Sequence, residues 1–521
     1  MPLNAVLKNA FIIAFITFFS RVLGYIRDAV IAAALGATPM ADAFLIAFRI
    51  PNFLKKLFSE GALSITFIPL FSEIMEKQGL KAAYSLVAQI IGWITGIFIP
   101  LIFAVGYFAG PVFDILMPAE APGAAATAHA VLYFRIMLPY VFLIGLSSIL
   151  MAVLNVRGYF AGPAAGPFFF NLCVIAAAYL PYFHNKAACL SMGVLTGGFL
   201  QLAILLPAFR SIFSSCKFTE RNALNGKSTG ARIGLLKTAF AFPASVVAVS
   251  AYHVNVMTGA FLASDLPSGS ISGLYFADRL VQFPLGLFVS AFAVAVLPEL
   301  SKLSISEHIE KTREELTNAS AFVFFIIAPA MTGMIVLKEP FVTMLFQRGL
   351  FDAHAAQLTS RALMFYALGI WAYAHTRVTS GFFIAGNNTA VPFKAALVSI
   401  GLNIVFGIVL KNMMGYAGIA LAASLSAAVQ FLLLVYVLFR KKWLTWNRAL
   451  WLSVVKPAAA SGVMALSLVL LMNCSSLGTD MGVWALIALI ITGALVYTLT
   501  SLIMRSSEIE KILDILRKKN E

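Results

Sequence analysis

Charged residues are scarce in this chain of 521 residues. Only 11% are Asp, Glu, Lys or Arg and 61% are hydrophobic, whereas soluble domains have about 25% charged and about 45–50% apolar residues. This imbalance excludes a water-soluble fold. A helix that crosses a bilayer needs about 20 mostly apolar residues, so the composition predicts an all-α polytopic membrane protein.

Residues that would support catalysis or hold a metal are also few and dispersed. The four cysteines form no CxxC pair, and the six histidines are scattered along the chain. These patterns indicate neither a metal site nor a redox motif. No GxxxxGK[ST] sequence is present, which excludes a P-loop for ATP hydrolysis. We expect no cofactor and no enzyme activity; a membrane-bound polyprenyl-phosphate transferase is the enzymatic alternative.

Fourteen apolar segments are expected to cross the membrane. They lie between charged or Gly/Pro-rich breaks, and their centres fall near residues 20, 55, 95, 141, 171, 198, 247, 285, 330, 371, 401, 427, 462 and 492. The first segment is preceded by a short basic region but followed by no small-residue cleavage site, so we interpret it as an uncleaved span and not a signal peptide.

Basic residues are distributed unevenly between the two sides of this predicted bundle. With both chain ends on one side, that side has sixteen Lys and Arg in three regions, 210–237, 440–456 and 505–519, and the connections on the other side have four. The positive-inside rule then predicts that both termini lie in the cytoplasm. Basic segments beside anionic lipid headgroups account for much of the net charge of +15. We therefore expect contacts with membrane lipids and no nucleic-acid partner.

Two stretches of sequence recur at nearly the same spacing. ITFIPLFSEI resembles AVAVLPELSKL, with Pro69 and Pro298 separated by 229 positions. NVRGYFAGPAAGPF resembles GFFIAGNNTAVPF, with Pro167 and Pro392 separated by 225 positions. Chance likeness between apolar, Pro-containing helices is the alternative to a duplication. A duplication predicts two six-helix lobes of the same orientation, related by a pseudo-two-fold axis along the membrane normal, and two additional C-terminal helices.

This plan predicts the domain boundaries. They are an N-terminal lobe at 1–210, a cytoplasmic linker at 211–232, a C-terminal lobe at 233–440, helices thirteen and fourteen at 441–504, and a cytoplasmic amphipathic tail at 505–521. Parallel repeats place a substrate between two lobes that rock against each other. The organisation therefore predicts a transporter that works by alternating access.

Charged residues interrupt three of the predicted spans. A central Arg or Lys costs about 2.5 to 3.5 kcal/mol on insertion scales, so several of them facing lipid would be hard to accommodate. Ion pairing, such as Arg21 with Asp28, or snorkelling to an interface is one interpretation. The other is a wet cavity. The residues are Arg21, Arg27 and Asp28 in the first span, with Ser20 beside them; Asp42, Arg49, Lys55, Lys56 and Glu60 in the second; and Asp278, Arg279 and Gln282 in the eighth.

Cations outnumber carboxylates in this set, so a cavity formed by these residues would be positive. Arginine suits such a cavity because its planar guanidinium can grip a phosphate at two points and stays protonated when partly desolvated. The pattern therefore predicts an anionic, phosphorylated substrate. A multidrug cation exporter would instead require acidic residues in the cavity, and a structural scaffold for envelope synthesis would tolerate loss of the arginines.

Three motifs carry a resemblance to a known family. SRVLGYIRDAVIA at 20–32, ADAFLIAFRIPNFLKKLFSEGALSITFIPLFSE at 41–73 and YFADRLVQFP at 275–284 resemble the MurJ (MviN) family of lipid II flippases. That family belongs to a superfamily of multidrug, oligosaccharidyl-lipid and polysaccharide exporters with two six-helix lobes. The resemblance implies transport of lipid II, the undecaprenyl-diphosphate-linked peptidoglycan precursor, from the inner to the outer leaflet, and hence a role in cell wall biogenesis and cell shape.

The resemblance also implies which residues bind the substrate. They are Arg21, Arg27, Asp28, Asp42, Arg49, Lys56 and Arg279, with secondary roles for Ser20, Lys55, Glu60, Asp278 and Gln282. Some family members have a lysine at the position of Arg49, an arginine at Lys56 and a glutamate at Gln282. In relatives an aspartate occurs where this chain has Asn387 and Asn388, so we assign no sodium site. We expect a monomer; an exporter of another polyprenyl-diphosphate-linked glycan is the related alternative.

Overall fold

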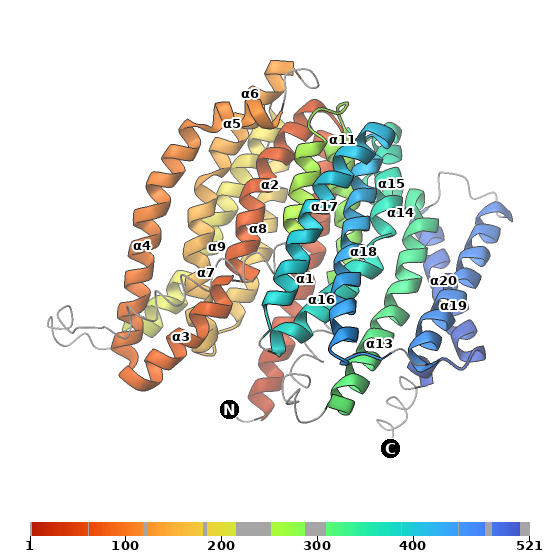
Figure 1. Ribbon diagram of the computed structural model, residues 1–521. Coiled ribbons are helices and arrows are strands. Elements are labelled where there is room, and N and C mark those ends of the chain that lie inside the picture. The colour runs from red at the N-terminus through yellow and green to blue at the C-terminus, as the bar shows by residue number, and fades with distance from the viewer. Residues whose placement is uncertain are drawn as a thin grey trace. The chain divides into compact units, whose positions relative to one another are not determined.

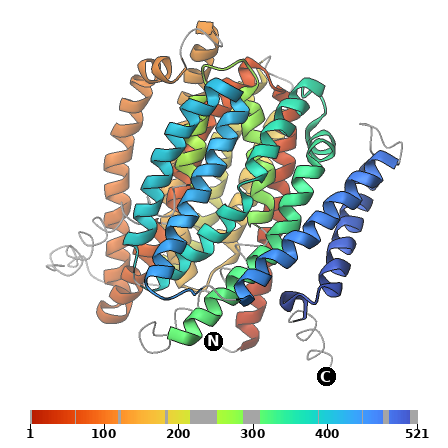
Figure 2. The same cartoon turned by 45° about the vertical axis from the view of Figure 1, so that its right-hand side comes forward.

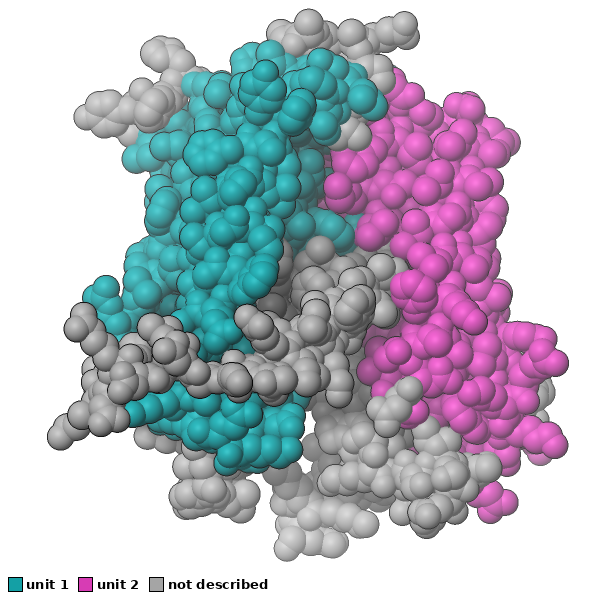
Figure 3. All heavy atoms as spheres, turned by 60° about the vertical axis from the view of Figure 1, so that its left-hand side comes forward, with its two compact units in different colours: residues 1–253, 267–269 teal, residues 254–266, 270–521 magenta. Residues whose placement is uncertain are grey.

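The computed structural model describes residues 3–60, 62–117, 123–180, 185–214, 252–286, 309–386, 388–445, 448–474 and 482–510. These residues form helices joined by short turns, and no strand occurs among them (Figures 1 and 2). The all-α fold class is therefore confirmed. The described part of the chain divides into two compact units (Figure 3). Unit 1 comprises residues 1–253 and 267–269, and unit 2 comprises residues 254–266 and 270–521.

Unit 1 is formed by nine labelled helices among its described residues. They are α1 (Leu3–Leu35), α2 (Pro39–Glu60), α3 (Ala62–Gln78), α4 (Leu80–Tyr107), α5 (Ala109–Leu116), α6 (Gly123–Met137), α7 (Pro139–Val156), α8 (Ala161–Ala178) and α9 (Lys186–Ser214). Helix α8 packs against both α1 and α9, and α2 packs against α6 and α7. An apolar core from α3, α4, α7 and α9, which includes Phe67, Phe71, Tyr84 and Val153, holds one end of the unit together.

Unit 2 contains most of a short unlabelled helix at 252–262, from residue 254 onward, and nine labelled helices in its described residues. The labelled helices are α11 (Ser270–Pro284), α13 (Ile309–Val336), α14 (Lys338–Phe346), α15 (Ala353–Ala367), α16 (Ile370–Ala385), α17 (Ala390–Met414), α18 (Tyr416–Arg440), α19 (Arg448–Cys474) and α20 (Val483–Ile503). Helices α19 and α20 lie side by side and α19 packs on α13 (Figures 1 and 2). A cluster around Phe325, Met464 and Tyr497 joins them.

Glycine allows the tight turn between α17 and α18. Gly415 has a φ of +63°, a conformation that glycine adopts without steric cost. A Cβ atom on Gly418 would lie 2.1 Å from the carbonyl oxygen of Leu410, so the two helices approach more closely than any side chain at that position would permit. These two glycines therefore set the geometry of the antiparallel pair.

Nine of the fourteen predicted spans match helices that are long and apolar enough to cross a membrane, counting only described residues. The predicted centres near 95, 141, 171, 198, 330, 401, 427, 462 and 492 each fall within one of these nine. Of the other five centres, those near 20, 55 and 371 fall in or beside α1, α2 and α16. The centre near 285 lies at the end of α11, and the one near 247 lies outside the described residues.

The predicted span centred near residue 55 corresponds to α2, and the apolar stretch that follows it forms a separate helix. Residues 65–74, the ITFIPLFSEI stretch, belong to the separate helix α3, which begins at Ala62 after α2 ends at Glu60. Helix α3 directs Phe67, Phe71 and Ile74 into the core of unit 1 and leaves Lys77 and Glu73 exposed in a pair at 2.8 Å. Helix α3 is therefore amphipathic, with an apolar face in the core and a charged face exposed.

Most of the predicted linker at 211–232 lies outside the described residues.

Candidate functional site

A buried ion pair on α1 is the centre of the candidate site in unit 1. The guanidinium of Arg27 donates from Nε and Nη2 to Oδ1 of Asp28, at 3.1 and 2.8 Å. The two residues are only 7% and 2% exposed. Adjacent residues on a helix point about 100° apart, but the arginine side chain is long enough to fold back on its neighbour. The positive charge of Arg27 is therefore matched by Asp28.

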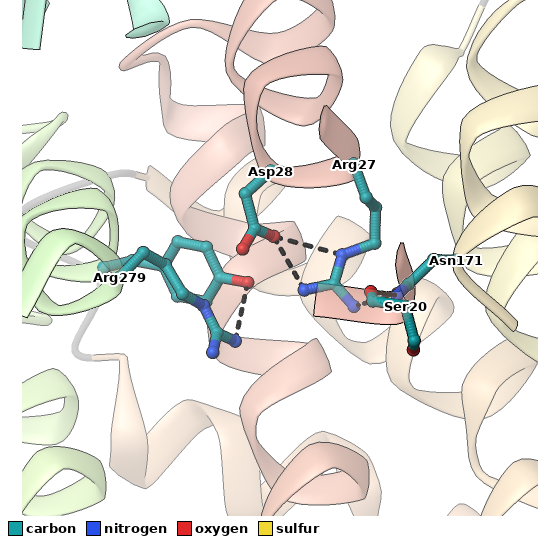
Figure 4. Close-up of polar contacts among 6 residues, drawn as sticks. Ser20, Arg27, Asp28, Asn171 and Arg279 are labelled. Carbon is teal, nitrogen blue, oxygen red and sulfur yellow. Dashed lines mark hydrogen bonds and ion pairs between the residues drawn. The ribbon is translucent and has the colours of Figure 1, made fainter. Parts of the chain in front are cut away.

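Helix α8 holds the other edge of this guanidinium. Nη1 of Arg27 donates to Oδ1 of Asn171 at 3.0 Å, and Nδ2 of Asn171 donates to the backbone carbonyl of Ser20 at 3.0 Å. Figure 4 shows Arg27 between Asp28 and Asn171. The oxygen and the nitrogen of the Asn171 amide are thus both hydrogen-bonded, and they contact α1 at two residues almost two helical turns apart. The orientation of Arg27 is fixed by the packing of α1 on α8.

Helix α2 adds charged residues to the same unit. Asp42 is 4% exposed and its Oδ2 accepts from the backbone N–H of Gly269 at 2.6 Å. Arg49 is 8% exposed. The ammonium Nζ of Lys55 lies 4.0 Å from the ring centroid of Phe170, the residue before Asn171, within the distance range of a cation–π interaction. Phe170 and Asn171 therefore bring α8 next to cations from two different helices.

In unit 2, Arg279 on α11 folds back over its own helix. Its Nη2 donates to the hydroxyl of Tyr275 at 3.0 Å, and its guanidinium carbon lies 4.8 Å from the centroid of that ring (Figure 4). Residues 275 and 279 are one turn apart, so they share a face of the helix. Asp278 beside it is 7% exposed. The tyrosine thus holds the guanidinium by both its hydroxyl and its π face.

The remaining predicted residues differ in environment. Arg21 is exposed, Ser20 is half-buried, and Gln282 is half-buried on α11. The side chains of Lys56 and Glu60 lie outside the described residues, as does Asn387, whereas Asn388 is half-buried in the turn before α17. Predictions for the side chains of Lys56 and Glu60 stay predictions.

Unit 1 has an excess of positive charge among its predicted site residues. Arg21, Arg27, Arg49 and Lys55 are described, against two carboxylates, Asp28 and Asp42. Since Asp28 is bound by Arg27, the excess rests on Arg21, Arg49 and Lys55. Such a set suits an anion whose negative groups are spread over several atoms, as in a diphosphate.

Four residues that contribute to the site were missed by the sequence-based predictions. Asn171 and Phe170 on α8, Tyr275 on α11, and Arg377 on α16, whose Nη1 lies 3.4 Å from the carbonyl of Leu285, were not among the predicted set. Asn171 had a signal: it is the single polar residue in the run FFFNLCVIAAA at 168–178. Arg377 had one too, as a charge inside the tenth predicted span.

No group of three or more His, Cys, Asp or Glu side chains that could hold a metal ion occurs among the described residues. The candidate site is thus built from cations, single carboxylates, amides and aromatic rings.

Comparison with known proteins identifies the family. The family model described as lipid II flippase MurJ matches residues 31–493, which covers most of the chain. The chain belongs to the lipid II flippase MurJ family. A relative from Vibrio cholerae, named "Probable lipid II flippase MurJ", is 31% identical over 438 residues, 82% of each chain. Another from Burkholderia cenocepacia, named "Lipid II flippase MurJ", is 29% identical over 423 residues, 80% of this chain and 81% of that one.

Solved structures agree with this family assignment. A structure titled "Lipid II flippase MurJ, inward closed conformation" superimposes with a TM-score of 0.79 at 26% identity, covering 96% of this chain and all of that one. An inward-facing MATE multidrug transporter of the MOP superfamily has a TM-score of 0.66 at 13% identity, covering 83% of this chain and 99% of that one, a likeness of fold alone. The matched family range contains Asp42, Arg49 and Arg279, while Arg27 and Asp28 precede it.

Proposed function

We propose that this protein moves lipid II, the undecaprenyl-diphosphate-linked peptidoglycan precursor, from the inner to the outer leaflet of the bacterial inner membrane. The observation that carries the proposal is membership of the lipid II flippase MurJ family over residues 31–493, together with the cations of α1, α2 and α11. A transporter that changes no covalent bond needs no catalytic residues, and the proposal includes no cofactor and a monomer as the working unit.

In this proposal the diphosphate headgroup binds the cations while the polyprenyl tail stays in the membrane. A diphosphate cannot cross hydrocarbon unaided because charges are strongly destabilised there. Arg21, Arg49 and Arg279 would form charge-assisted hydrogen bonds to its oxygens, each about twice as strong as a neutral one. The Arg27–Asp28 pair would orient the headgroup, since the Nη1 edge of Arg27 is already directed by Asn171.

Two contacts support a pair of related six-helix lobes within a fourteen-helix protein. Arg27 donates to Asn171, 144 residues later, and Nδ2 of Asn255 donates to Oγ of Ser399 at 3.2 Å, also 144 residues later. Asn255 follows Arg27 by 228 positions, and Ser399 follows Asn171 by 228 positions. This offset lies between the 225 and 229 found in the sequence. Equivalent helix pairs in each lobe would produce this equality.

The membrane potential would favour the proposed direction of movement. With both termini and the basic segments in the negative cytoplasm, an anion moving outward gains about 2.3 kcal/mol per charge per 100 mV. Helices α19 and α20 would contribute an apolar groove for the tail. The sides of the membrane on which the termini lie belong to this proposal, and they rest on the distribution of Lys and Arg.

Growth of bacteria depleted of their own lipid II flippase tests the proposal. Expression of this chain should restore growth, and charge-removing changes at Arg21, Arg49 and Arg279 should abolish the rescue while the protein still reaches the membrane. Arg348→Gln, at an exposed arginine bound to the carbonyl of Met344, is the matched control and should rescue. Drug export that persists without these arginines would instead favour a multidrug exporter.

A further inference from the structure

A buried histidine in unit 2 lies outside the set of residues assigned to the candidate substrate site. His375 is on α16 and is 6% exposed. Its Nδ1 lies 2.7 Å from the backbone carbonyl oxygen of Trp371, one turn earlier on the same helix. Its Nε2 lies 3.2 Å from the backbone carbonyl oxygen of Ser320 on α13. Both ring nitrogens therefore face hydrogen-bond acceptors, one on each of two helices.

A neutral imidazole ring cannot satisfy both contacts. It has one N–H donor, and its other nitrogen presents a lone pair. In either neutral tautomer, one ring lone pair would point at a carbonyl oxygen, which also carries lone pairs, so that contact would be repulsive. The imidazolium has two N–H donors and can donate to both carbonyl oxygens at once. The geometry around His375 is thus complementary to the protonated ring.

Two phenylalanine rings also favour a positive charge at this position. The ring centroids of Phe324 on α13 and Phe431 on α18 lie 5.9 and 5.2 Å from the centroid of the His375 ring. A cation within about 6 Å of an aromatic ring is attracted by the ring quadrupole. The Trp371 ring meets Phe431 edge-on at 5.6 Å and so helps to fix its position. These contacts offset part of the cost of removing a charged ring from water.

The contacts of the His375 ring with the described part of the chain include no charged side chain. The helices packed around α16 are α13, α17 and α18, and their titratable groups lie farther along them. These groups, with those of α16 itself, include Arg313, Glu314 and Glu315 on α13, Lys394 and Lys411 on α17, Tyr436 and Arg440 on α18, and Tyr373 and Arg377 on α16. The last two are each two positions from His375, about 200° around the helix. A charge on the ring therefore depends on proton uptake and not on an ion pair.

Helices α13 and α16 each contact another part of unit 2. The carbonyl oxygen of Phe325 on α13 accepts from the Tyr497 hydroxyl of α20 at 2.6 Å. Nη1 of Arg377 on α16 lies 3.4 Å from the carbonyl oxygen of Leu285, directly after α11. Helix α11 carries Arg279. A bond between α16 and α13 therefore connects the helix that carries Arg279 with the C-terminal helices.

We propose that His375 is a proton-binding site that controls the connection between α13 and α16. A proton from water adds to the lone pair of Nε2, and the resulting imidazolium donates to the carbonyl oxygens of Trp371 and Ser320 together. When this proton returns to water, Nδ1–H keeps the shorter contact with Trp371, and the contact with Ser320 becomes repulsive. Histidine changes its charge between about pH 5 and 8, so the connection responds to proton concentration. The inference does not rest on the proposed cargo, because the ring contacts none of the residues assigned to the substrate.

Nuclear magnetic resonance of the full-length protein in lipid nanodiscs tests the site. The protein carries ¹⁵N in its histidine rings and ¹³C in its serine carbonyl groups, and spectra are recorded from about pH 5 to about pH 8. The signals of His375 are those that disappear in His375→Gln. If that variant does not fold, a protein with glutamine in place of the other five of the six histidines gives the assignment. We expect two protonated ring nitrogens at low pH and one at high pH, with a correlation from Nε2–H to a serine carbonyl at low pH only.

Removal of one aromatic ring gives a quantitative check. Phe431→Leu keeps an apolar side chain but deletes the π face, so the pH at which half of the His375 rings are protonated should fall by about 0.5. Phe199→Leu, at an exposed phenylalanine of α9, is the matched control and should leave that pH unchanged. A His375 ring that keeps one protonation state over the whole range would overturn the proposal. A ring that titrates without the correlation to a serine carbonyl would also overturn it, because the proton would then not join α16 to α13.

Discussion

Arg27 and Asn171 lie 144 residues apart in the chain, yet Nη1 of the arginine is 3.0 Å from Oδ1 of the asparagine. The contact joins α1 to α8, and the same amide holds the carbonyl of Ser20. The guanidinium of Arg27 is thus held in one direction by contacts from α1 and α8. Preorganised groups bind a charged ligand more strongly because less ordering is required on binding.

Removing the amide should loosen this arrangement. Asn171→Leu deletes a hydrogen bond to a charged group, worth about 1.5–3 kcal/mol, and leaves the Nη1 edge of Arg27 without its partner. We expect a lower Tm and about tenfold slower lipid II transport in vesicles. Gln89→Leu, which removes an exposed amide bonded to Ser85, is the control and should change neither. Normal transport by Asn171→Leu would show that the direction of Arg27 is unimportant.

Removing the charge of Asp28 should lower the stability of the folded protein. Asp28→Asn leaves the buried guanidinium of Arg27 uncompensated, and breaking a buried ion pair from one side costs about 3–5 kcal/mol. The double variant Arg27→Gln with Asp28→Asn removes both charges and should recover most of the lost stability. Thermal unfolding in detergent measures this. We expect the double variant to fold but not to transport; recovery of transport with stability would assign the pair a purely structural role.

The Tyr275 hydroxyl should increase the affinity of Arg279 for lipid II. Tyr275→Phe removes the hydroxyl that accepts from Nη2 at 3.0 Å but keeps the ring 4.8 Å from the guanidinium carbon. The guanidinium then has more freedom, so we expect lipid II affinity to fall by about fivefold, equivalent to one hydrogen bond. Arg279→Gln should lower it further. Equilibrium binding of labelled lipid II is the measurement, and tighter binding by Tyr275→Phe would mean that the hydroxyl competes with the substrate.

The packing of the Phe170 ring, which Lys55 contacts, can be tested by a substitution on α9. A Cβ atom on Gly198 of α9 would lie 2.5 Å from the Tyr140 ring, and Tyr140 packs on Phe170 with ring centroids 5.3 Å apart. Gly198→Ala should therefore displace both rings, lower stability by about 1–3 kcal/mol, and slow transport. Gly96→Ala on α4 meets no atom within 4 Å and should leave the Tm equal or higher. A harmless Gly198→Ala would contradict this packing.

The apolar spans could be predicted because their signal is local. Helices such as α4, α17, α18 and α20 are long, apolar runs with charges only at or near their ends, and hydrophobic length alone identifies such spans. The break between α15 and α16 had no such signal. It lies next to Gly369, where a Cβ atom would be 2.6 to 2.8 Å from atoms of Ser424, so a tertiary contact with α18 determines it.

The site could be predicted only in part, for the same reason. Charges within apolar segments identified Arg27, Asp42 and Arg279, since insertion of a charge into hydrocarbon is costly wherever it occurs. Their partners could not be predicted, because periodicity gives the face of a residue on its own helix but not which helix packs there. The contact of Arg27 with Asn171 follows from the packing of α1 on α8.

Transport of lipid II across vesicles that contain only this protein tests the central claim most directly. Labelled lipid II is placed on the side of the basic segments, and its appearance on the opposite face is followed with an inside-negative potential. The account predicts movement by the wild type, acceleration by the potential, and a loss of about ten- to hundredfold in Arg27→Gln and Arg279→Gln, with Arg348→Gln unaffected. Equal movement by all four proteins, or none by the wild type, would contradict it.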